Sequence, residues 1–428
     1  MRIRNSVVGA FIALLLAVGG VVGVSGPAYA ADVGSIVGTV TGPNGGLLDA
    51  EITPMYKVGS EWQTDGVVHY PWNSDGDYLM EGLEPRQYIL LVAAREHPTL
   101  ATAYYVQGPS TGTSDPDRAT VLTVTAGGKL TGVNIRLGVG ATLSGKVTDP
   151  AGHPLQAQVG VRGELSNVQT ETDPVTGIYQ AVGLAAGDYT VGFSADGYVD
   201  KWWGGGEDPT PIHVDAGAAV LGIDVVLAAR GGLSGQVRVP TGFSTKSVYI
   251  TLYQDVSWSK EPNSWGYAGS AWGGATGKYS FTGLNPVRHK VCFELLGVQF
   301  RCYVNSSKIT NATPVAVKPG ATTTGVNLTF SRLAPTMTAT GKGAKKKATV
   351  KVAIKPTGGT AHGKSVKATG KVRIKLGSKV LKTSTLSGGK VTVTVTKLKK
   401  GKRKLAITYL GDKVFKPATK VVAVKVKK

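Results

Sequence analysis

A short pattern, Gly-x-Tyr followed by Gly-Leu, recurs three times in this 428-residue chain. Its tyrosines, Tyr78, Tyr179 and Tyr279, are 101 and 100 residues apart, and the Gly-Leu pairs keep the same spacing. Intervals of this length indicate that whole domains, rather than short solenoid units, have been duplicated. A tandem array of small domains is typical of binding and scaffolding proteins, and it leaves little sequence for a catalytic domain.

The local pattern predicts strands throughout the chain. Alternating apolar and polar runs bounded by Gly, Pro, Asn and Asp recur, and no amphipathic helical pattern exceeds about two turns. Each repeat opens with a Gly-containing strand and closes with an alternating strand, at 36–40 and 132–137, 143–147 and 222–227, and 233–237 and 325–330. We therefore expect an all-β chain of tandem Greek-key β-sandwiches, arranged like beads on a string, with seven or eight strands in each repeat.

The N-terminus has the layout of a secretory signal. Arg2 and Arg4 precede an apolar run, and Ala28-Tyr29-Ala30 provides an A-x-A cleavage site. We expect cleavage before Ala31 and no membrane span afterwards; the alternative is a retained anchor. The predicted organisation is a signal peptide at 1–30, repeats at 31–138, 139–229 and 230–332, and a fourth domain at 333–428.

The order of motifs within the repeats resembles the carboxypeptidase regulatory-like domain. The shared elements are the opening Gly-x-Val strand, Gly-x-Tyr, Gly-Leu and the closing apolar strand, over residues 34–330. The resemblance implies a transthyretin-like, or carbohydrate-binding-like, sandwich. It also implies a secreted or surface module that serves as a stalk, an adhesive unit or a glycan-binding appendage, sometimes attached to enzymes such as amylases.

The chain contains two cysteines, Cys292 and Cys302, placed symmetrically about Gly297. A hairpin that turns at Gly297 would place their Cα atoms about 4.5–5.5 Å apart, which suits a disulfide. Secretion would expose the pair to an oxidising compartment. We therefore expect a disulfide; the alternative is two buried free thiols, and the spacing matches no zinc pattern.

Two aromatic clusters suggest a glycan-binding surface. Trp202 and Trp203 precede three glycines in the second repeat, and Trp258, Trp265 and Trp272 lie in a Gly- and Ser-rich stretch of the third. We expect these rings on loops, where their flat faces could stack on sugars. The alternative is that one Trp of each cluster covers the sandwich core, because Trp is highly buried on average.

No catalytic or metal-binding constellation is recognisable. Asp75 and Asp77 resemble part of a calcium loop, but the distal Glu is missing, and turn chemistry explains them. The six His are scattered, and no carboxylate pair of the glycosidase type is evident. We expect no catalytic residues, no metal and no cofactor, so an enzyme is the weaker hypothesis.

The composition changes abruptly at Leu333. Residues 333–428 contain 26 Lys and Arg and a single acid, a net charge of +25, whereas the rest of the chain carries −4. Strands such as 347–355 and 371–376 alternate, which predicts that the cations share a sheet face while the aliphatic side chains are buried. The cations selected for polyanion binding are Lys371, Arg373, Lys375, Lys399, Lys400, Lys402, Arg403 and Lys404.

The segments 370–372, 386–391 and 409–417 resemble a bacterial immunoglobulin-like domain. The resemblance covers 333–428 and implies a sandwich used in secreted and surface proteins. That family is commonly acidic or neutral, so the lysine enrichment is this chain's departure from it.

These features predict a secreted, non-enzymatic bacterial binding or scaffold protein, extracellular or associated with the cell wall. Its cationic domain would bind anionic cell-wall polymers such as teichoic acid. The alternative is a protein that binds a starch-like polysaccharide and is accessory to an α-amylase-type glycoside hydrolase. Nucleic acid would bind without specificity, because 24 of the 26 cations are Lys and none lies in a base-reading motif. The ligand and the oligomeric state stay open.

Overall fold

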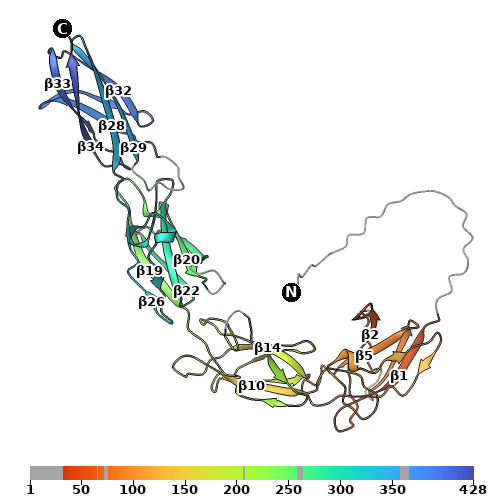
Figure 1. The fold of residues 1–428 in the computed structure, drawn as a ribbon. Helices are drawn as coiled ribbons and strands as arrows, with labels where there is room; N and C mark the ends of the chain where they lie inside the picture. Colours follow the sequence, from red (N-terminus) through yellow and green to blue (C-terminus); the bar gives the residue numbers. More distant parts are fainter. Residues whose placement is uncertain (1–31, 65, 72–75, 206–207, 258–263, 357–365) are drawn as a thin grey trace, which may run out of the picture.

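The computed structural model describes residues 32–64, 66–71, 76–205, 208–257, 264–356 and 366–428. They form four β-sandwiches in a curved row, domain 1 to domain 4 from the N-terminus to the C-terminus (Figure 1). The predicted all-β class of tandem sandwiches is confirmed. The predicted signal peptide lies outside the described residues, and no helix in the described part of the chain is long and apolar enough to cross a membrane.

The described residues of the three repeats form nine strands in each repeat. Domain 1 has β1 (Gly34–Thr41), β2 (Glu51–Val58), β3 (Glu61–Thr64), β4 (Asp77–Leu83), β5 (Gln87–Ala93), β6 (Ala103–Tyr104), η1 (Pro116–Arg118), β7 (Leu122–Thr123), β8 (Lys129–Leu130) and β9 (Ile135–Arg136). Domain 2 has β10 (Ala141–Thr148), β11 (Gln158–Arg162), β12 (Asn167–Glu171), β13 (Ile178–Leu184), β14 (Gly187–Ser194), β15 (Lys201–Trp202), β16 (Ile212–Val214), β17 (Ala219–Val220) and β18 (Val225–Val226). Domain 3 has β19 (Gly231–Arg238), η2 (Thr245–Ser247), β20 (Val248–Asp255), β21 (Trp265–Trp272), β22 (Lys278–Leu284), β23 (Arg288–Leu295), β24 (Gln299–Cys302), η3 (Tyr303–Asn305), η4 (Ile309–Asn311), β25 (Val315–Ala316), β26 (Thr322–Thr323) and β27 (Leu328–Thr329).

Each repeat is built from the same two sheets. In domain 1, the first sheet has the order β4-β1-β8, and β9 also pairs with β1. The second sheet has the order β3-β2-β5-β6, and β7 also pairs with β5. The opening strand β1 is antiparallel to β4 and parallel to the closing strands β8 and β9. The strand number exceeds the expected seven or eight because several strands span only two residues, too few to show alternation.

The repeated sequence pattern forms one hydrogen-bonded unit, which we call the clasp. In domain 2, a Cβ on Gly145 would lie only 2.1 Å from the carbonyl oxygen of Ile223, so only Gly allows this carbonyl to approach the opening strand. The Tyr179 hydroxyl donates to the same oxygen at 2.9 Å. The Asp224 carboxylate then accepts the backbone N–H of Lys146 at 2.8 Å. The clasp therefore ties the opening strand, the Gly-x-Tyr strand and the closing segment together.

The same clasp recurs in the other two repeats. In domain 1, Tyr78 donates to the carbonyl of Val133 at 2.6 Å. In domain 3, Tyr279 donates to the carbonyl of Val326. The equivalents of Gly145 and Asp224 are Gly38 with Asn134 and Gly235 with Asn327. Burial raises the pKa of each clasp tyrosine, which keeps its hydroxyl protonated and donating.

Domains 1 and 2 are joined without a free linker. The backbone of Leu100 pairs with that of Val139 in an antiparallel bridge, and Gly140 donates to the carbonyl of Thr99 at 2.9 Å. Leu165 of domain 2 packs against an apolar cluster of domain 1. These contacts join the two domains into one continuous surface.

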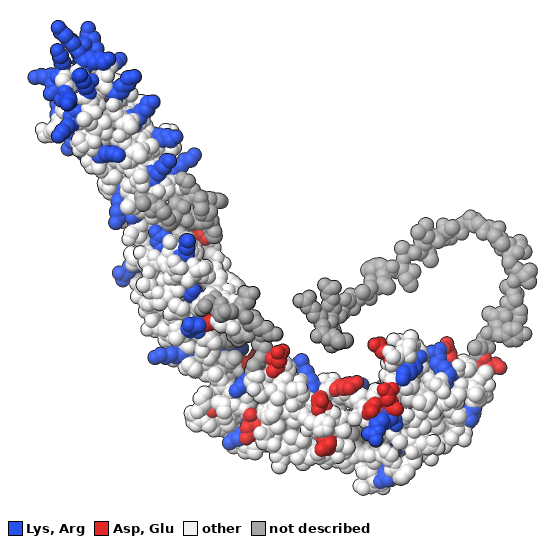
Figure 2. Space-filling model, in the orientation of Figure 1, with Lys and Arg blue, Asp and Glu red and all other residues white. Residues whose placement is uncertain are grey.

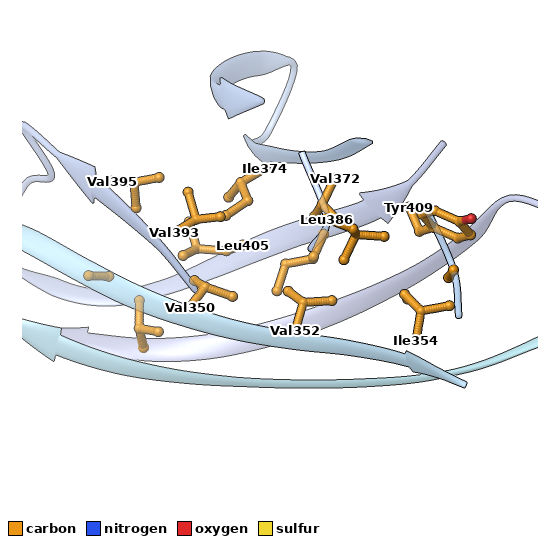
Figure 3. Close-up of a cluster of buried hydrophobic side chains, with 14 of the residues drawn as sticks. Val350, Val352, Ile354, Val372, Ile374, Leu386, Val393, Val395, Leu405 and Tyr409 are labelled. Atoms are coloured by element: carbon orange, nitrogen blue, oxygen red, sulfur yellow. The ribbon is translucent and has the colours of Figure 1, made fainter. Parts of the chain in front are cut away.

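Domain 4 is a separate sandwich. Its strands are β28 (Pro335–Ala344), β29 (Lys347–Pro356), β30 (Lys371–Leu376), β31 (Lys379–Thr385), β32 (Lys390–Thr396), β33 (Gly401–Tyr409) and β34 (Ala418–Val426). They form a sheet β28-β29-β32 and a sheet β31-β30-β33-β34. Alternate residues point inward, so that Val350 and Val352 on one sheet face Ile374 and Leu405 on the other (Figure 3). As in the three repeats, the core lies between two sheets.

The predicted hairpin and disulfide are confirmed in domain 3. β23 and β24 are antiparallel with Cys292 opposite Cys302, and Gly297 lies in the turn with a φ of +66°. The two sulfur atoms are bonded, and the Cα atoms are 3.8 Å apart, closer than the expected 4.5–5.5 Å. Both cysteines are buried, and the disulfide crosslinks β23 to β24 at the edge of the sheet.

Candidate binding sites

The five-stranded sheet of each repeat has an outer face, which points away from the core, and the repeats cover it differently. In domain 1 this face carries an apolar cluster that includes Ile89, Tyr104 and Ala119. In domain 3 it carries the disulfide and Ala312. No comparable buried cluster forms among the described residues of domain 2. Its outer face holds a groove instead.

The centre of this groove is a cavity of about 280 Å³ over the middle of the sheet. Gly160 and Gly192 lie opposite each other on β11 and β14 and form its floor. The indole of Trp202 lies directly over Gly192, so that a Cβ added to Gly192 would be 2.9 Å from the ring. The Gln169 amide lies over Gly160 in the same way. The guanidinium of Arg162 is 5.8 Å from the centre of the Trp202 ring.

Two further cavities, of about 530 and 510 Å³, extend the groove. One shares Gln158, Ser194 and Asp200 with the central cavity and reaches Tyr198. The other shares Gln169 and lies at the junction, where residues of domain 1 also line it. We call the three cavities together the domain 2 groove.

The two tryptophans of the domain 2 cluster have separate roles. Trp202 lies on the strand β15 rather than on the predicted loop, and it lines the groove. Trp203 packs against the core of domain 2, as the alternative interpretation predicted for one Trp of the cluster. Three lining residues were not predicted from the sequence: Gly160, Gly192 and Gln169. Each occupies an outward position of an alternating strand, but only the strand pairing shows that the two glycines are neighbours.

Domain 3 presents its aromatic side chains on an edge strand. A β-bulge at Ala268 shifts the register between β20 and β21, so that Tyr267 lies opposite Tyr253. Because strand side chains alternate, the extra residue turns Trp265 and Tyr267 to the outer face that Trp272 already occupies. Tyr267 and Trp272 are 64% and 54% exposed.

The prediction that Trp265 and Trp272 lie on loops is therefore wrong, because their Gly- and Ser-rich segment pairs with β20 as a strand. The Trp265 ring lies 4.3 Å from the Lys290 ammonium, and burial lowers the pKa of that lysine. Trp272 contacts Tyr249 with ring centres 5.0 Å apart. Trp258 lies outside the described residues.

The cations of domain 4 occupy both outer faces of the sandwich rather than the single face predicted. Both sheets alternate, and a sandwich has two outer faces. On β30, three cations alternate with buried aliphatic residues: Lys371, Arg373 and Lys375. The outward lysines of the other sheet are Lys342, Lys347, Lys351, Lys355 and Lys390.

Lysines are concentrated at the end of domain 4 that is farthest from domain 3 (Figure 2). Leu398 donates its backbone N–H to the carbonyl of Lys346 at 3.0 Å, which brings the β28–β29 turn against the β32–β33 turn. A bridge between Lys345 and Lys427 adds the C-terminal segment. The ten lysines of these segments, which we call the lysine tip, are Lys345, Lys346, Lys347, Lys397, Lys399, Lys400, Lys402, Lys425, Lys427 and Lys428.

No counter-charge neutralises the lysine tip in the described part of domain 4. The salt bridges among the described residues all lie in domains 1 to 3. The one acid of domain 4, Asp412, accepts backbone N–H groups of Thr369, Val414 and Phe415 at 2.7–2.8 Å. Burial alone would raise the pKa of Asp412, but these hydrogen bonds outweigh it and hold the pKa below its ordinary value. Its carboxylate closes a turn instead of balancing lysines.

The structure separates the eight cations selected from the sequence. Three belong to the lysine tip: Lys399, Lys400 and Lys402. Lys404 follows on β33 and is exposed. Arg403 donates to the carbonyls of Lys399 and Lys400 at 3.0 and 2.7 Å, so its guanidinium supports the turn. The β30 cations lie apart from the lysine tip, and Lys371 pairs with the opposite end of β33.

The formal charge changes sign along the row of domains. Residues 31–229 carry 9 Lys and Arg and 23 Asp and Glu, a net −14. Residues 230–332 carry 11 against 3, a net +8, and residues 333–428 carry +25. The acidic groups gather on domains 1 and 2 and the basic groups on domain 4 (Figure 2).

The His and carboxylate groups form no enclosed site within the described ranges, and no cluster of three or more His, Cys, Asp or Glu is positioned to hold a metal ion there. His213 and Asp188 are 2.7 Å apart, and this hydrogen bond raises the pKa of His213. Both side chains are 69% exposed, so water surrounds the pair. Asp77 begins β4, and Asp75 lies outside the described residues.

No family model and no curated protein matches the chain. Among solved structures, a streptococcal ancillary pilin is 10% identical with a TM-score of 0.28, over 70% of this chain and all of the pilin. The Bacillus anthracis TIE protein is 15% identical with a TM-score of 0.22, over 69% of this chain and half of that protein's length. A putative carbohydrate binding protein from Bacteroides uniformis is 10% identical with a TM-score of 0.18, over 46% of this chain and 98% of its own. At these scores we transfer no function from any of them.

Proposed function

We propose that this chain is a non-enzymatic, extracellular binding protein that attaches to an anionic cell-surface polymer through the lysine tip. The observation that carries the proposal is that three chain segments bring ten lysines together at the end of domain 4 farthest from domain 3, away from the one acid of that domain, Asp412 (Figure 2). Lys402 and Lys425 lie directly opposite each other, an arrangement that destabilises a sheet unless a counter-charge binds. A surface of this kind attracts polyanions.

The remaining domains support the same role. Domains 1 and 2 carry −14, so a polyanion held by the lysine tip would repel them. The row would then stand away from the surface to which domain 4 is attached. The resemblances to regulatory-like repeats and to a bacterial immunoglobulin-like domain suit a stalk of this kind, and wall teichoic acid, with its repeated phosphates, is the polymer that we propose.

The test is retention of the full-length protein on purified bacterial cell walls, with and without prior removal of teichoic acid. Retention should require the teichoic acid and should fall between ~0.1 M and ~1 M salt, where the Debye length shrinks from about 10 Å to about 3 Å. Retention that ignores salt, or that survives removal of the polymer, contradicts the proposal.

A matched pair of variants separates the lysine tip from net charge alone. The tip variant replaces four lysines by Gln: Lys345, Lys346, Lys399 and Lys400. The control replaces four lysines elsewhere in domain 4: Lys371, Lys379, Lys413 and Lys416. Both lower the net charge equally, so only the tip variant should lose most of its retention. Equal losses would show that the position of the lysines does not matter.

A further inference from the structure

The domain 2 groove is distant in sequence from the lysine tip and has a different chemistry. We propose that it binds an extended, uncharged polysaccharide chain, with Trp202 as the stacking wall. The site lies on the outer face of β12, β11, β14 and β15 and continues to the junction with domain 1.

The shape of the groove suits a chain rather than a single sugar. It crosses four neighbouring strands, which at about 4.8 Å per strand is about 14 Å, and both end cavities extend it. Its floor is low because Gly160 and Gly192 leave the middle of the sheet without side chains. Trp202 stands at one side of this floor, where its indole can contact the face of a sugar ring.

The polar lining suits hydroxyl groups. It is dominated by carboxamide and hydroxyl side chains: Thr53, Thr102, Gln156, Gln158, Ser166, Asn167, Gln169, Thr170, Gln180 and Ser194. A carboxamide both donates and accepts hydrogen bonds, as does each hydroxyl of a sugar. A polysaccharide can therefore satisfy these groups along the whole groove.

The charge of the groove favours an uncharged ligand. The three cations of the lining are Arg95, Arg162 and Lys201, and its three acids are Glu51, Asp196 and Asp200. The lining is therefore neutral, and Arg95 is paired with Glu51. The surrounding net charge of −14 on residues 31–229 repels polyanions.

A peptide fits this groove less well. Extended peptides bind sheets by pairing with a free strand edge. The floor strands β11 and β14 are both paired on their two sides, β11 with β12 and β14, and β14 with β15 as well. The backbone beneath the groove is therefore already hydrogen-bonded.

The test is isothermal titration of the full-length protein with four soluble uncharged polysaccharides: starch, mixed-linkage β-glucan, glucomannan and dextran. Salt at ~0.5 M suppresses binding by the lysine tip, because exposed charges are then screened beyond about 4 Å. We expect at least one of the four to bind. Failure of all four overturns the proposal.

Two variants locate the site. Trp202→Ala removes the stacking wall, and Gly160→Val fills the floor without removing any polar group. The backbone of Gly160 has no positive φ, so a strand can accept Val there. Each variant should weaken binding by about tenfold or more, as truncation at the centre of a binding site does.

The controls separate this site from the other surfaces. Trp272→Ala removes an exposed ring on domain 3 and should leave affinity unchanged, as should the tip variant. Hydrogen exchange of domain 2 peptides shows whether each groove variant is folded. If Trp202→Ala unfolds the domain, the affinity of Gly160→Val for the polysaccharide is the test of the proposal. Unchanged affinity in a folded groove variant, or an equal loss in Trp272→Ala, overturns the proposal. Retention on cell walls is measured separately, so the two proposals can fail independently.

Discussion

Replacing Gly145 by Ala tests whether the clasp determines the stability of a repeat. The new Cβ would lie 2.1 Å from the carbonyl oxygen of Ile223, where ordinary contact begins at 3.4 Å, so the closing segment must move away. Overpacking of this kind costs about 1–3 kcal/mol. Losing the hydrogen bond from Tyr179 adds about 1 kcal/mol. The expected loss of about 3 kcal/mol in the free energy of unfolding corresponds to a factor of about 100 in the unfolding equilibrium.

Hydrogen exchange followed by mass spectrometry measures this loss, because four separate cores would overlap in a global unfolding curve. Peptides of β10 and β13 should exchange about 100-fold faster in Gly145→Ala, while domains 3 and 4 are unchanged. Gly160→Ala is the matched control, because its Cβ would meet only the movable amide of Gln169. An acceleration below tenfold in Gly145→Ala, or one no larger than in the control, would refute the role of the clasp.

Three further predictions concern domains 3 and 4. Replacing Cys292 and Cys302 by Ser should lower the free energy of unfolding of domain 3 by about 2–3 kcal/mol through loss of the loop constraint; unchanged hydrogen exchange in the peptides of domain 3 would contradict this. Asp412→Ala should destabilise domain 4 by about 2 kcal/mol at neutral pH. The pKa of Asp412 is lowered in the folded state, so the stabilisation by its carboxylate is complete above the ordinary pKa of about 3.9 and is lost as the pH falls through the folded pKa. If hydrogen exchange showed that Asp412→Ala destabilises domain 4 equally near pH 7 and near pH 2, this prediction would be contradicted. Arg403→Lys keeps the charge but loses the hydrogen bonds to the turn, so it should reduce stability by about 1 kcal/mol and leave retention on walls unchanged; weaker retention would show that the guanidinium contacts the polymer.

The duplicated motif was sufficient to predict the fold because its residues are structural. Gly145 and Tyr179 are needed wherever the closing segment crosses the opening strand, so they recur with the domain. The hairpin at Gly297 was predictable for a similar reason, since turn and pairing are both local in sequence. Strand alternation likewise identified which aliphatic residues of domain 4 are buried.

The candidate sites were less predictable because they depend on register and on contacts between distant segments. A single extra residue at Ala268 decides which face Trp265 occupies, and no sequence pattern marks the bulge. The groove floor requires Gly160 to pair with Gly192, which lie 32 positions apart. The lysine tip arises because separate turns meet, so a contiguous basic run identified only part of it.

The parallel pairing of first and last strands determines how the chain responds to tension. In each repeat the opening strand lies parallel to the closing one, as β1 does to β9, β10 to β18 and β19 to β27. Domain 4 follows the same rule through its bridge between Lys345 and Lys427. A pull on the two ends of such a domain slides these strands past each other, so their hydrogen bonds are loaded together in shear rather than broken one by one. Tension along the row, from β1 in domain 1 to the C-terminal segment of domain 4, would therefore load these parallel strand pairs in series, one in each of the four domains.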